Sequence, residues 1–169
     1  MSEPFAPLLA RIDDRLIHGQ VVVGCCEPLG ARDILLVDDA VAGDSLQQKL
    51  YRAAVPPEVT VRFTGVDGAR ELIEATERDR GLDRLIVVAA HARTMDRLRR
   101  AGIAFRCIQL GGAHARQGTR ELLPGIFLDR EDLDALRALV DSGAEVFVQP
   151  VAAAASQPLS AAMLAEVDS

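Results

Sequence analysis

The stretch Arg11-Ile12-Asp13-Asp14-Arg15-Leu16-Ile17-His18-Gly19-Gln20-Val21 decides the fold of this chain. The apolar run that precedes it, residues 5–10, is typical of a buried β-strand, and the apolar residues 21–23 indicate the start of a helix. The stretch therefore predicts a strand-to-helix turn that carries a histidine and four charged side chains. In open parallel sheets, binding sites form at such turns, outside the carboxyl ends of the strands.

The rest of the chain alternates short apolar runs with amphipathic stretches. Strands are predicted at 34–37, 59–63, 85–89, 107–110 and 146–149, and helices at 46–54, 69–77, 94–100 and 131–141, the last with Asp129 as its N-cap. We expect a short edge element at 122–127, a small-residue linker at 152–158 and a terminal helix at 160–166. The alternation predicts an α/β fold in a single domain over residues 1–169, with a doubly wound, mainly parallel β-sheet and helices on both faces.

Composition limits the kind of protein. The chain has 169 residues, is 49% hydrophobic and 26% charged, and carries a net charge of -6. These values are typical of a globular protein and argue against nucleic acid as a partner. No apolar run reaches the length of a membrane span, and residues 1–5 do not resemble a signal peptide, so a cytoplasmic protein is expected.

The sequence offers no pattern for a metal or an organic cofactor. Its three cysteines, Cys25, Cys26 and Cys107, have no metal-ligand spacing and no disulfide framework. Neither a Walker loop nor a Gly-x-Gly-x-x-Gly motif is present. We therefore expect no metal and no cofactor.

The chemistry of the turn centres on His18. Imidazole is a nucleophile near neutral pH, and guanidinium groups match the oxygens of a phosphoryl group. With Arg11 and Arg15 nearby, the turn suits a histidine that accepts a phosphoryl group. Arg11 has two interpretations, because it lies at the strand end: it contacts the phosphoryl group, or it pairs with Asp13 or Asp14.

The other polar residues of the turn have supporting roles. Asp13 and Asp14 cannot bind phosphate, so we expect them to hold the arginines and the loop, or to be ordinary loop-stabilising residues. Gly19 permits close backbone approach, and Gln20 caps the helix or lines the site.

Three further positions carry open alternatives. Gly111 and Gly112 are expected to open a loop after a strand, where backbone N–H groups can form an anion nest. His114, two residues on, is either close to His18 or a surface side chain of a tight turn. His91 lies either beside the site or at the exposed start of a helix.

The motif at residues 11–21 resembles the active-site loop of the IIB component of the mannose/fructose/sorbose family of the bacterial sugar phosphotransferase system (PTS). Shorter matching pieces follow in the order of that family, and the similarity covers roughly residues 7 to 150. These pieces lie at 37–42, 53–57, 110–112 and 127–133. The resemblance implies that Nδ1 of His18 takes a phosphoryl group from a phosphohistidine of the IIA component. It also makes Arg15 the residue that stabilises charge on this group, and it places the Gly111-Gly112 pair at the border of the site.

The resemblance also implies partners and a setting. The chain would be a protein-phosphohistidine–sugar phosphotransferase (EC 2.7.1 type) that docks phosphorylated IIA and the IIC/IID sugar permease, and it would transfer the group to a sugar held by IIC/IID. It would then be cytoplasmic and peripherally associated with that permease. A homodimer is compatible with the sequence, which identifies neither the oligomeric state nor the sugar.

Two alternatives stay open at this point. Cys25, Ala113 and Thr119 stand where family members commonly carry tryptophan, a large apolar residue and lysine. A regulatory phosphoprotein, phosphorylated at His18 without completing sugar transport, is therefore one alternative. The other is a small-molecule enzyme with His18 as general base, which predicts a closed apolar pocket beside the loop.

Overall fold

The computed structural model describes residues 6–151 and 153–166 and shows one α/β domain built on a seven-stranded sheet. The strand order is β3-β2-β4-β1-β5-β8-β9, and every pairing is parallel except that of β8 with β9. The strands are β1 (Leu9–Asp13), β2 (Asp33–Val37), β3 (Thr60–Thr64), β4 (Leu85–Ala89), β5 (Cys107–Gly112), β8 (Glu145–Val148) and β9 (Gln157–Pro158). β6 (Arg120–Leu123) and β7 (Ile126–Leu128) form a separate antiparallel hairpin.

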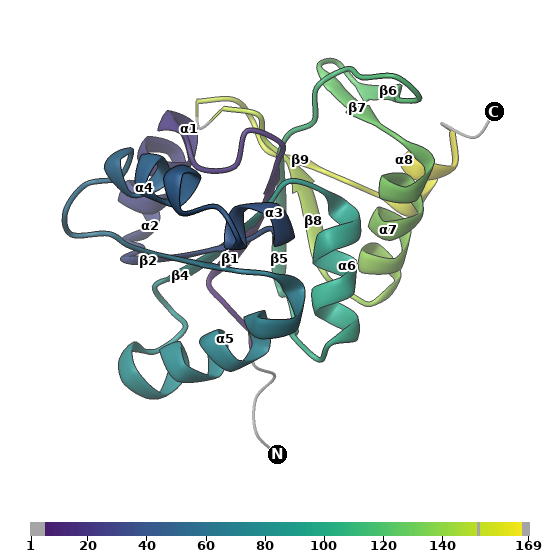
Figure 1. Ribbon diagram of the computed structural model, residues 1–169. Helices are drawn as coiled ribbons and strands as arrows, with labels where there is room; N and C mark the ends of the chain where they lie inside the picture. The colour runs from purple at the N-terminus through teal and green to yellow at the C-terminus, as the bar shows by residue number, and fades with distance from the viewer. Residues whose placement is uncertain (1–5, 152, 167–169) are drawn as a thin grey trace.

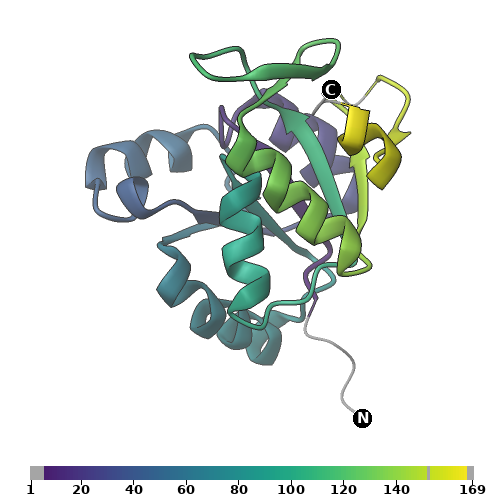
Figure 2. The ribbon, with the colours of Figure 1, turned by 90° about the vertical axis from the view of Figure 1, so that its right-hand side faces the viewer.

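Helices cover both faces of the sheet (Figures 1 and 2). They are α1 (Gly19–Val21), the π-helix η1 (Val22–Cys26), α2 (Glu27–Leu29), α3 (Asp39–Ala42), α4 (Ser45–Ala53), α5 (Val66–Arg80), α6 (Ala92–Arg100), α7 (Arg130–Asp141) and α8 (Ala161–Glu166). Apolar side chains of α5, α6, α7 and α8 pack on one face of the sheet, and those of α1, η1 and α3 pack on the other. The predicted doubly wound, mainly parallel sheet is confirmed.

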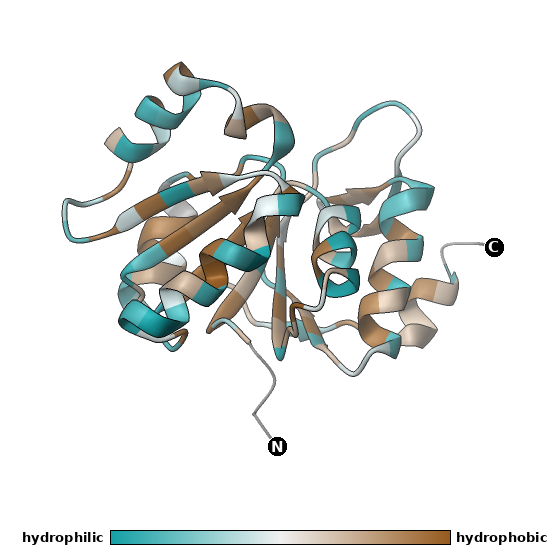
Figure 3. Cartoon of the chain, turned by 60° about the horizontal axis from the view of Figure 1, so that its bottom comes forward, coloured by the Kyte–Doolittle hydropathy of each residue, from teal (hydrophilic) through white to brown (hydrophobic). Residues whose placement is uncertain are grey.

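The core follows from the alternation of side chains along the strands. In β1, Ala10 and Ile12 belong to the cluster with α5, α6 and α7, whereas Leu9 belongs to the cluster with η1. All residues of β2 and β4 are buried, because helices cover both sides of these central strands. Figure 3 shows the result as hydrophobic strands beneath helices whose outer surfaces are hydrophilic.

Two predicted strands have wrong boundaries, and both carry part of the functional region. The strand expected at 5–10 is β1 (Leu9–Asp13), which starts and ends later, so Arg11 and Asp13 lie in the strand and not in the turn; Phe5 lies outside the described residues. β5 extends through Gly111 and Gly112, which therefore do not open a loop. Both strands continue beyond their apolar residues, into charged residues in β1 and into two glycines in β5. Such residues are uncommon in strands, so the sequence does not indicate these extensions. Here the charges neutralise one another inside the sheet.

Two other expectations need smaller corrections. The element at 122–127 is the β6–β7 hairpin, which turns at 124–125, and not a single edge element. Part of the segment 152–158 is the strand β9, whose residues pair with Phe147 and Val148, while Ala152 lies outside the described residues. The predicted helix starts and ends otherwise agree with the structure to within a few residues, and α8 corresponds to the expected terminal helix. No helix in the described part of the chain is long and apolar enough to cross a membrane.

Candidate functional site

The candidate site lies in the turn between β1 and α1, at the carboxyl end of a central strand. The turn closes with a hydrogen bond from the Leu16 N–H to the Asp13 carbonyl at 2.9 Å, and Leu16 adopts a left-handed conformation with φ 57°. Such a backbone costs about 1–2 kcal/mol for a residue other than glycine. Burial of Leu16 and Ile17 in the core offsets this cost. Because these two side chains point inward, Arg15 and His18 are left nearer the surface.

Asp13 is the centre of the site. Its side chain is 0% exposed and accepts from both neighbouring arginines. Arg11 Nη2 lies 2.7 Å from Oδ2, while Arg15 donates from Nε at 3.0 Å, from Nη2 at 3.1 Å and from its backbone N–H at 3.1 Å. Burial alone would raise the pKa of Asp13, but the hydrogen bonds from Arg15 and the charge of Arg11 outweigh it and lower the pKa. Asp13 is therefore a buried carboxylate shared by two guanidinium groups.

The two arginines differ in what they can reach. The Arg15 side chain is 41% exposed, and its hydrogen bond with Asp13 raises the pKa of the guanidinium. Arg11 is 2% exposed, and its Nη1 donates to Gln109 Oε1 at 2.5 Å and to Cys25 Sγ at 3.8 Å. Of the two interpretations of Arg11, the structure shows the ion pair with Asp13.

Gly111 and Gly112 provide space for this ionic cluster. A Cβ on Gly111 would lie 2.1 Å from Arg11 Cζ, and one on Gly112 would lie 2.7 Å from Asp13 Oδ1 and 3.1 Å from Arg15 Nη2. Both glycines thus border the site, but as strand residues over which the charged side chains lie, and not as a loop nest. The structure thus places the Gly-Gly pair against Arg11, Asp13 and Arg15.

The His18 ring stands at the edge of the cluster, with its side chain 22% exposed. Nδ1 lies 3.0 Å from the Leu16 carbonyl oxygen and Nε2 lies 3.6 Å from Asp13 Oδ2. Nε2 is buried and has no hydrogen-bond partner among the described residues. In this conformer Nδ1 contacts the backbone and Nε2 faces Asp13.

The residues on either side of His18 are placed differently. His18 is the N-cap of α1 and has an extended backbone, so the helix begins directly after it at Gly19. A Cβ on Gly19 would meet no atom within 4 Å, which leaves open space on that side of the turn. Gln20 belongs to α1, and the structure does not describe its side chain.

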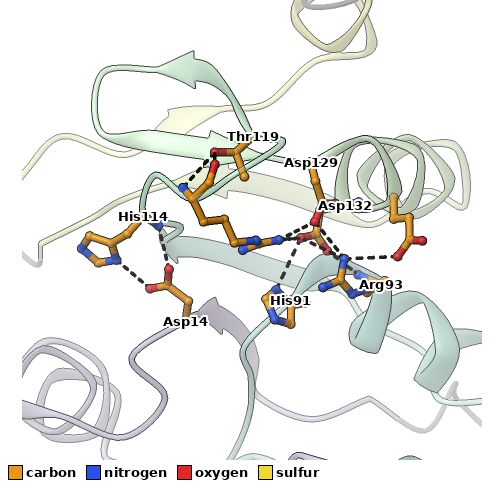
Figure 4. Close-up of polar contacts among 9 residues, drawn as sticks. Asp14, His91, Arg93, His114, Thr119, Asp129 and Asp132 are labelled. Carbon is orange, nitrogen blue, oxygen red and sulfur yellow. Dashed lines mark hydrogen bonds and ion pairs between the residues drawn. The ribbon is translucent and has the colours of Figure 1, made fainter.

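Asp14 and His114 form a second contact of the same turn (Figure 4). Asp14 Oδ2 accepts from the His114 backbone N–H at 2.7 Å, and Oδ1 lies 2.7 Å from His114 Nδ1. The Asp14 N–H donates in turn to the Gly112 carbonyl at 3.1 Å. Asp14 therefore holds the turn to the segment after β5 and, unlike Asp13, forms its close contacts with a histidine and not with an arginine. His114, whose side chain is 62% exposed, is attached to the site loop through Asp14.

A neighbouring polar cluster joins α6 to α7 and includes His91. Figure 4 shows His91, Arg93, Asp129 and Asp132 converging. His91 Nδ1 lies 3.4 Å from the buried Asp132 Oδ2, and Arg116 pairs with both aspartates. Burial would raise the pKa of Asp129, but the Asp132 N–H and the two arginines lower it to about 2. His91 is the N-cap residue of α6, as one interpretation predicted, and its contact is with α7.

The predicted N-cap at Asp129 is confirmed, and Asp38 caps a second helix. Asp38 accepts from the N–H groups of Ala40 and Val41 at the start of α3. Asp129 accepts from the Asp132 N–H at the start of α7. These residues therefore stabilise helix ends and are separate from the site.

One cavity lies at the other end of β1 from the turn, and the described side chains form no group that could hold a metal ion. A cavity of about 350 Å³ is lined by residues 6–8, Glu77, Leu82, Asp83 and Arg106, around the start of β1 and so at the opposite end of the strand from His18. Within residues 6–151 and 153–166, no group of three or more histidine, cysteine or acidic side chains is arranged to hold a metal ion.

One neighbour of the cluster, Gln109, was missed by the sequence analysis. It is 5% exposed and contacts both Arg11 and Cys25, whose thiol donates to Gln109 Oε1 at 3.2 Å. Burial raises the pKa of Cys25, so this thiol is a neutral neighbour of the site. The available signal was a lone amide inside the apolar strand 107–110, immediately before the Gly-Gly pair.

Comparison with known proteins places this arrangement in a family. Residues 8–168 match the family model of the PTS system sorbose subfamily IIB component. The N-acetylgalactosamine-specific phosphotransferase enzyme IIB component 1 of Escherichia coli (strain K12) is 31% identical over 145 residues, which span 85% of this chain and 90% of the relative. The PTS system sorbose-specific EIIB component of Klebsiella pneumoniae is also 31% identical over 145 residues, with 85% and 87% covered.

Solved structures agree with these relatives. The crystal structure of the Escherichia coli N-acetylgalactosamine-specific IIB component 1 has a TM-score of 0.82 and 28% identity, and covers 90% of this chain and 99% of its own. The IIBSor domain of the sorbose permease from Klebsiella pneumoniae has a TM-score of 0.79 and 28% identity, with 89% and 91% covered. The fold and the relatives thus define the class as PTS IIB components with a doubly wound domain. The chain belongs to the PTS sorbose subfamily IIB component family.

Proposed function

We propose that this chain is a phosphoryl carrier of a sugar phosphotransferase system. His18 accepts a phosphoryl group from a phosphorylated IIA component and passes it to a sugar translocated by IIC/IID. The observation that carries the proposal is the placement of His18 beside Arg15, with both held around the buried carboxylate of Asp13. Membership of a family of PTS IIB components supports it.

The chemistry needs positioning and charge more than bond-making groups from the protein. A nitrogen of the His18 ring, expected to be Nδ1, forms a bond to phosphorus while the P–N bond of the donor phosphohistidine breaks. The attacking nitrogen uses its lone pair, so the proton of the neutral ring lies on the other nitrogen; that proton is lost as the new P–N bond forms, and the donor imidazole takes one up. In the second step the His18 P–N bond breaks, a sugar hydroxyl oxygen receives the group and loses its proton, and the His18 ring takes one up.

Arg15 is the residue proposed to stabilise the transferring group. Its guanidinium is partly exposed, whereas the guanidinium of Arg11 is enclosed by the protein. A planar fork matches two phosphoryl oxygens, so Arg15 can turn from Asp13 toward the group when it arrives. Arg11 then remains as the partner that neutralises Asp13. Asp13 thus positions both arginines, and Asp14 positions the turn through His114.

The partners follow from the carrier role. Phosphorylated IIA and the IIC/IID permease must both reach the single ring of His18, so they use overlapping surfaces around the turn. Open space beside Gly19 leaves that side of the turn accessible to them, and the His18 side chain is 22% exposed. We place the protein in the cytoplasm, peripherally associated with the permease, as a transferase that acts on a sugar bound by IIC/IID.

The test is sugar phosphorylation in a reconstituted system. Purified protein is combined with the general PTS proteins, a phosphorylated IIA and membranes that contain IIC and IID, and sugar phosphate is measured. The proposal predicts formation of sugar phosphate that requires the chain and is lost in His18→Ala. Labelled protein without sugar phosphate, over a panel of sugars and cognate membranes, would favour the regulatory phosphoprotein instead.

A further inference from the structure

A row of polar side chains crosses the sheet beneath the His18 turn; Arg11 and Gln109 are buried, and Gln149 is half-buried. Gln109 in β5 lies opposite Arg11 in β1, and its Oε1 accepts from Arg11 Nη1 at 2.5 Å. Gln109 Nε2 donates to Gln149 Oε1 at 2.8 Å, and Gln149 Nε2 donates to the Ala154 carbonyl at 3.0 Å. The row therefore links the Arg11–Asp13 pair to the segment that follows β8.

The order of donors and acceptors along this row is fixed. A backbone carbonyl only accepts, so Ala154 requires the NH₂ end of Gln149. The Oε1 end of Gln149 then faces Gln109 and requires its NH₂ end, which leaves Gln109 Oε1 for the Arg11 guanidinium. The reverse orientation would place an NH₂ group against a guanidinium, which has donors only. Gln149 thus supplies an acceptor for the NH₂ end of Gln109 and stabilises the orientation that Arg11 requires.

Arg11 depends on this acceptor because it has few others. Nη2 is bound by Asp13, Nη1 by Gln109 and by the weak acceptor Cys25 Sγ, and Nε has no hydrogen-bond partner among the described residues. The guanidinium is buried against Gly111, where no solvent replaces a lost partner. Without the Gln109 oxygen, the charged donor Arg11 Nη1 keeps only the weak acceptor Cys25 Sγ inside the protein. The guanidinium plane would then rotate, and its bond to Asp13 would weaken.

We propose that Gln109, oriented by Gln149, is a positioning residue for phosphoryl transfer at His18. It keeps the Arg11 guanidinium on Asp13 while Arg15 leaves Asp13 for the phosphoryl group. This inference rests on the proposed carrier function. It makes the rate of phosphoryl transfer depend on Gln109, whose contacts are with Arg11, Cys25 and Gln149.

The kinetic test uses single-turnover transfer from phosphorylated IIA to wild type, Gln109→Met and Gln149→Met, with exposed Gln47→Met as the matched control. Methionine keeps the length of glutamine without its hydrogen-bonding groups. The expected result is a maximal rate about 10-fold lower in Gln109→Met and a smaller loss in Gln149→Met, with an unchanged half-saturating donor concentration. Gln47→Met keeps the wild-type rate. Equal maximal rates in wild type and Gln109→Met would overturn the inference.

A double-mutant cycle separates positioning from a general loss of structure. If Gln109 acts through Arg11, then Gln109→Met has no further effect on the rate in an Arg11→Met background. A structural effect alone would lower the rate by the same factor in both backgrounds, and that result would contradict the inference.

A third measurement does not require phosphorylation. NMR titration of the Asp13 carboxyl carbon reports on its facing groups, which are Arg11, Arg15, His18 and the Cys25 thiol. We expect Gln109→Met to move the Asp13 midpoint to higher pH, since Arg11 no longer holds the carboxylate; an unchanged midpoint would overturn the inference. A wild type that stays unphosphorylated with a competent donor would instead remove the proposed function, so the two failures are distinguishable.

Discussion

Substitution of Gly111 by alanine tests whether the Gly-Gly pair provides space for the buried ionic cluster. The added Cβ would lie 2.1 Å from Arg11 Cζ, 2.2 Å from Nη2 and 2.5 Å from Nη1. Ordinary carbon contacts lie at about 3.5–4.0 Å, so the guanidinium must move by more than 1 Å, roughly. That movement strains a packed interior and weakens the buried pair with Asp13. Overpacking costs about 1–3 kcal/mol, and breaking a buried ion pair costs about 3–5 kcal/mol when it is complete.

We therefore expect Gly111→Ala to lower the free energy of unfolding by about 2–4 kcal/mol in urea denaturation, since the pair is displaced and not removed. Phosphoryl transfer should fall together with stability. Gly43→Ala is the control, because its Cβ would meet only the Ala40 carbonyl oxygen at 3.7 Å, an ordinary contact. The control should stay within about 0.5 kcal/mol of wild type. A Gly111→Ala protein as stable as the control would refute the packing argument.

Three further predictions follow from the charged groups. Arg15→Ala should slow single-turnover transfer about 10²–10³-fold, because the partly exposed guanidinium no longer stabilises charge on the phosphoryl group; equal rates would exclude the proposed role. Asp129→Ala should lower the unfolding free energy by about 1 kcal/mol in urea titration, through loss of the α7 N-cap, and no change would argue against that cap. The folded pKa of Asp13 is lowered from the usual 3.8, and that of Asp129 is lowered to about 2, so the unfolded chain binds protons more readily; stability should be constant above about pH 5 and decrease toward pH 2. Asp129→Ala should show a shallower decrease in acid denaturation, and an equally steep one would contradict this assignment.

The fold was largely predictable because its signals are local. Unbroken apolar runs such as 85–89 report strands covered on both faces, and Asp38 and Asp129 mark helix starts through their short side chains. The β-α alternation then leaves few topologies. The π-helical turn at 22–26 was not foreseen, because hydrophobic spacing over so few residues does not separate it from an α-helix.

The site was predictable in its membership and less so in its geometry. The motif at residues 11–21 indicated which side chains lie together in the candidate site, but not that Arg11 and Asp13 belong to the strand. A charged residue in a buried strand can be explained only once the residues that bind it are known. Gln109, which binds Arg11, lies 98 residues from it in the sequence. The attachment of Asp14 to His114 likewise depends on contact between distant segments.

The family assignment and the carrier role rest on different grounds. The match over residues 8–168 and the similarity to solved IIB structures show the family. The identity of the phosphoryl acceptor is proposed from the geometry around Asp13. The sugar is a property of the permease partners under this proposal, so it is to be determined with them.

The most direct test of the central claim is phosphoryl transfer from a phosphorylated IIA protein to wild type and to His18→Ala. We predict an acid-labile, base-stable phosphoryl group on wild type, located at His18 by ³¹P NMR and peptide mass spectrometry, and none on His18→Ala. A wild type that remains unlabelled with a donor shown to be competent, or an equally labelled His18→Ala protein, would contradict the account.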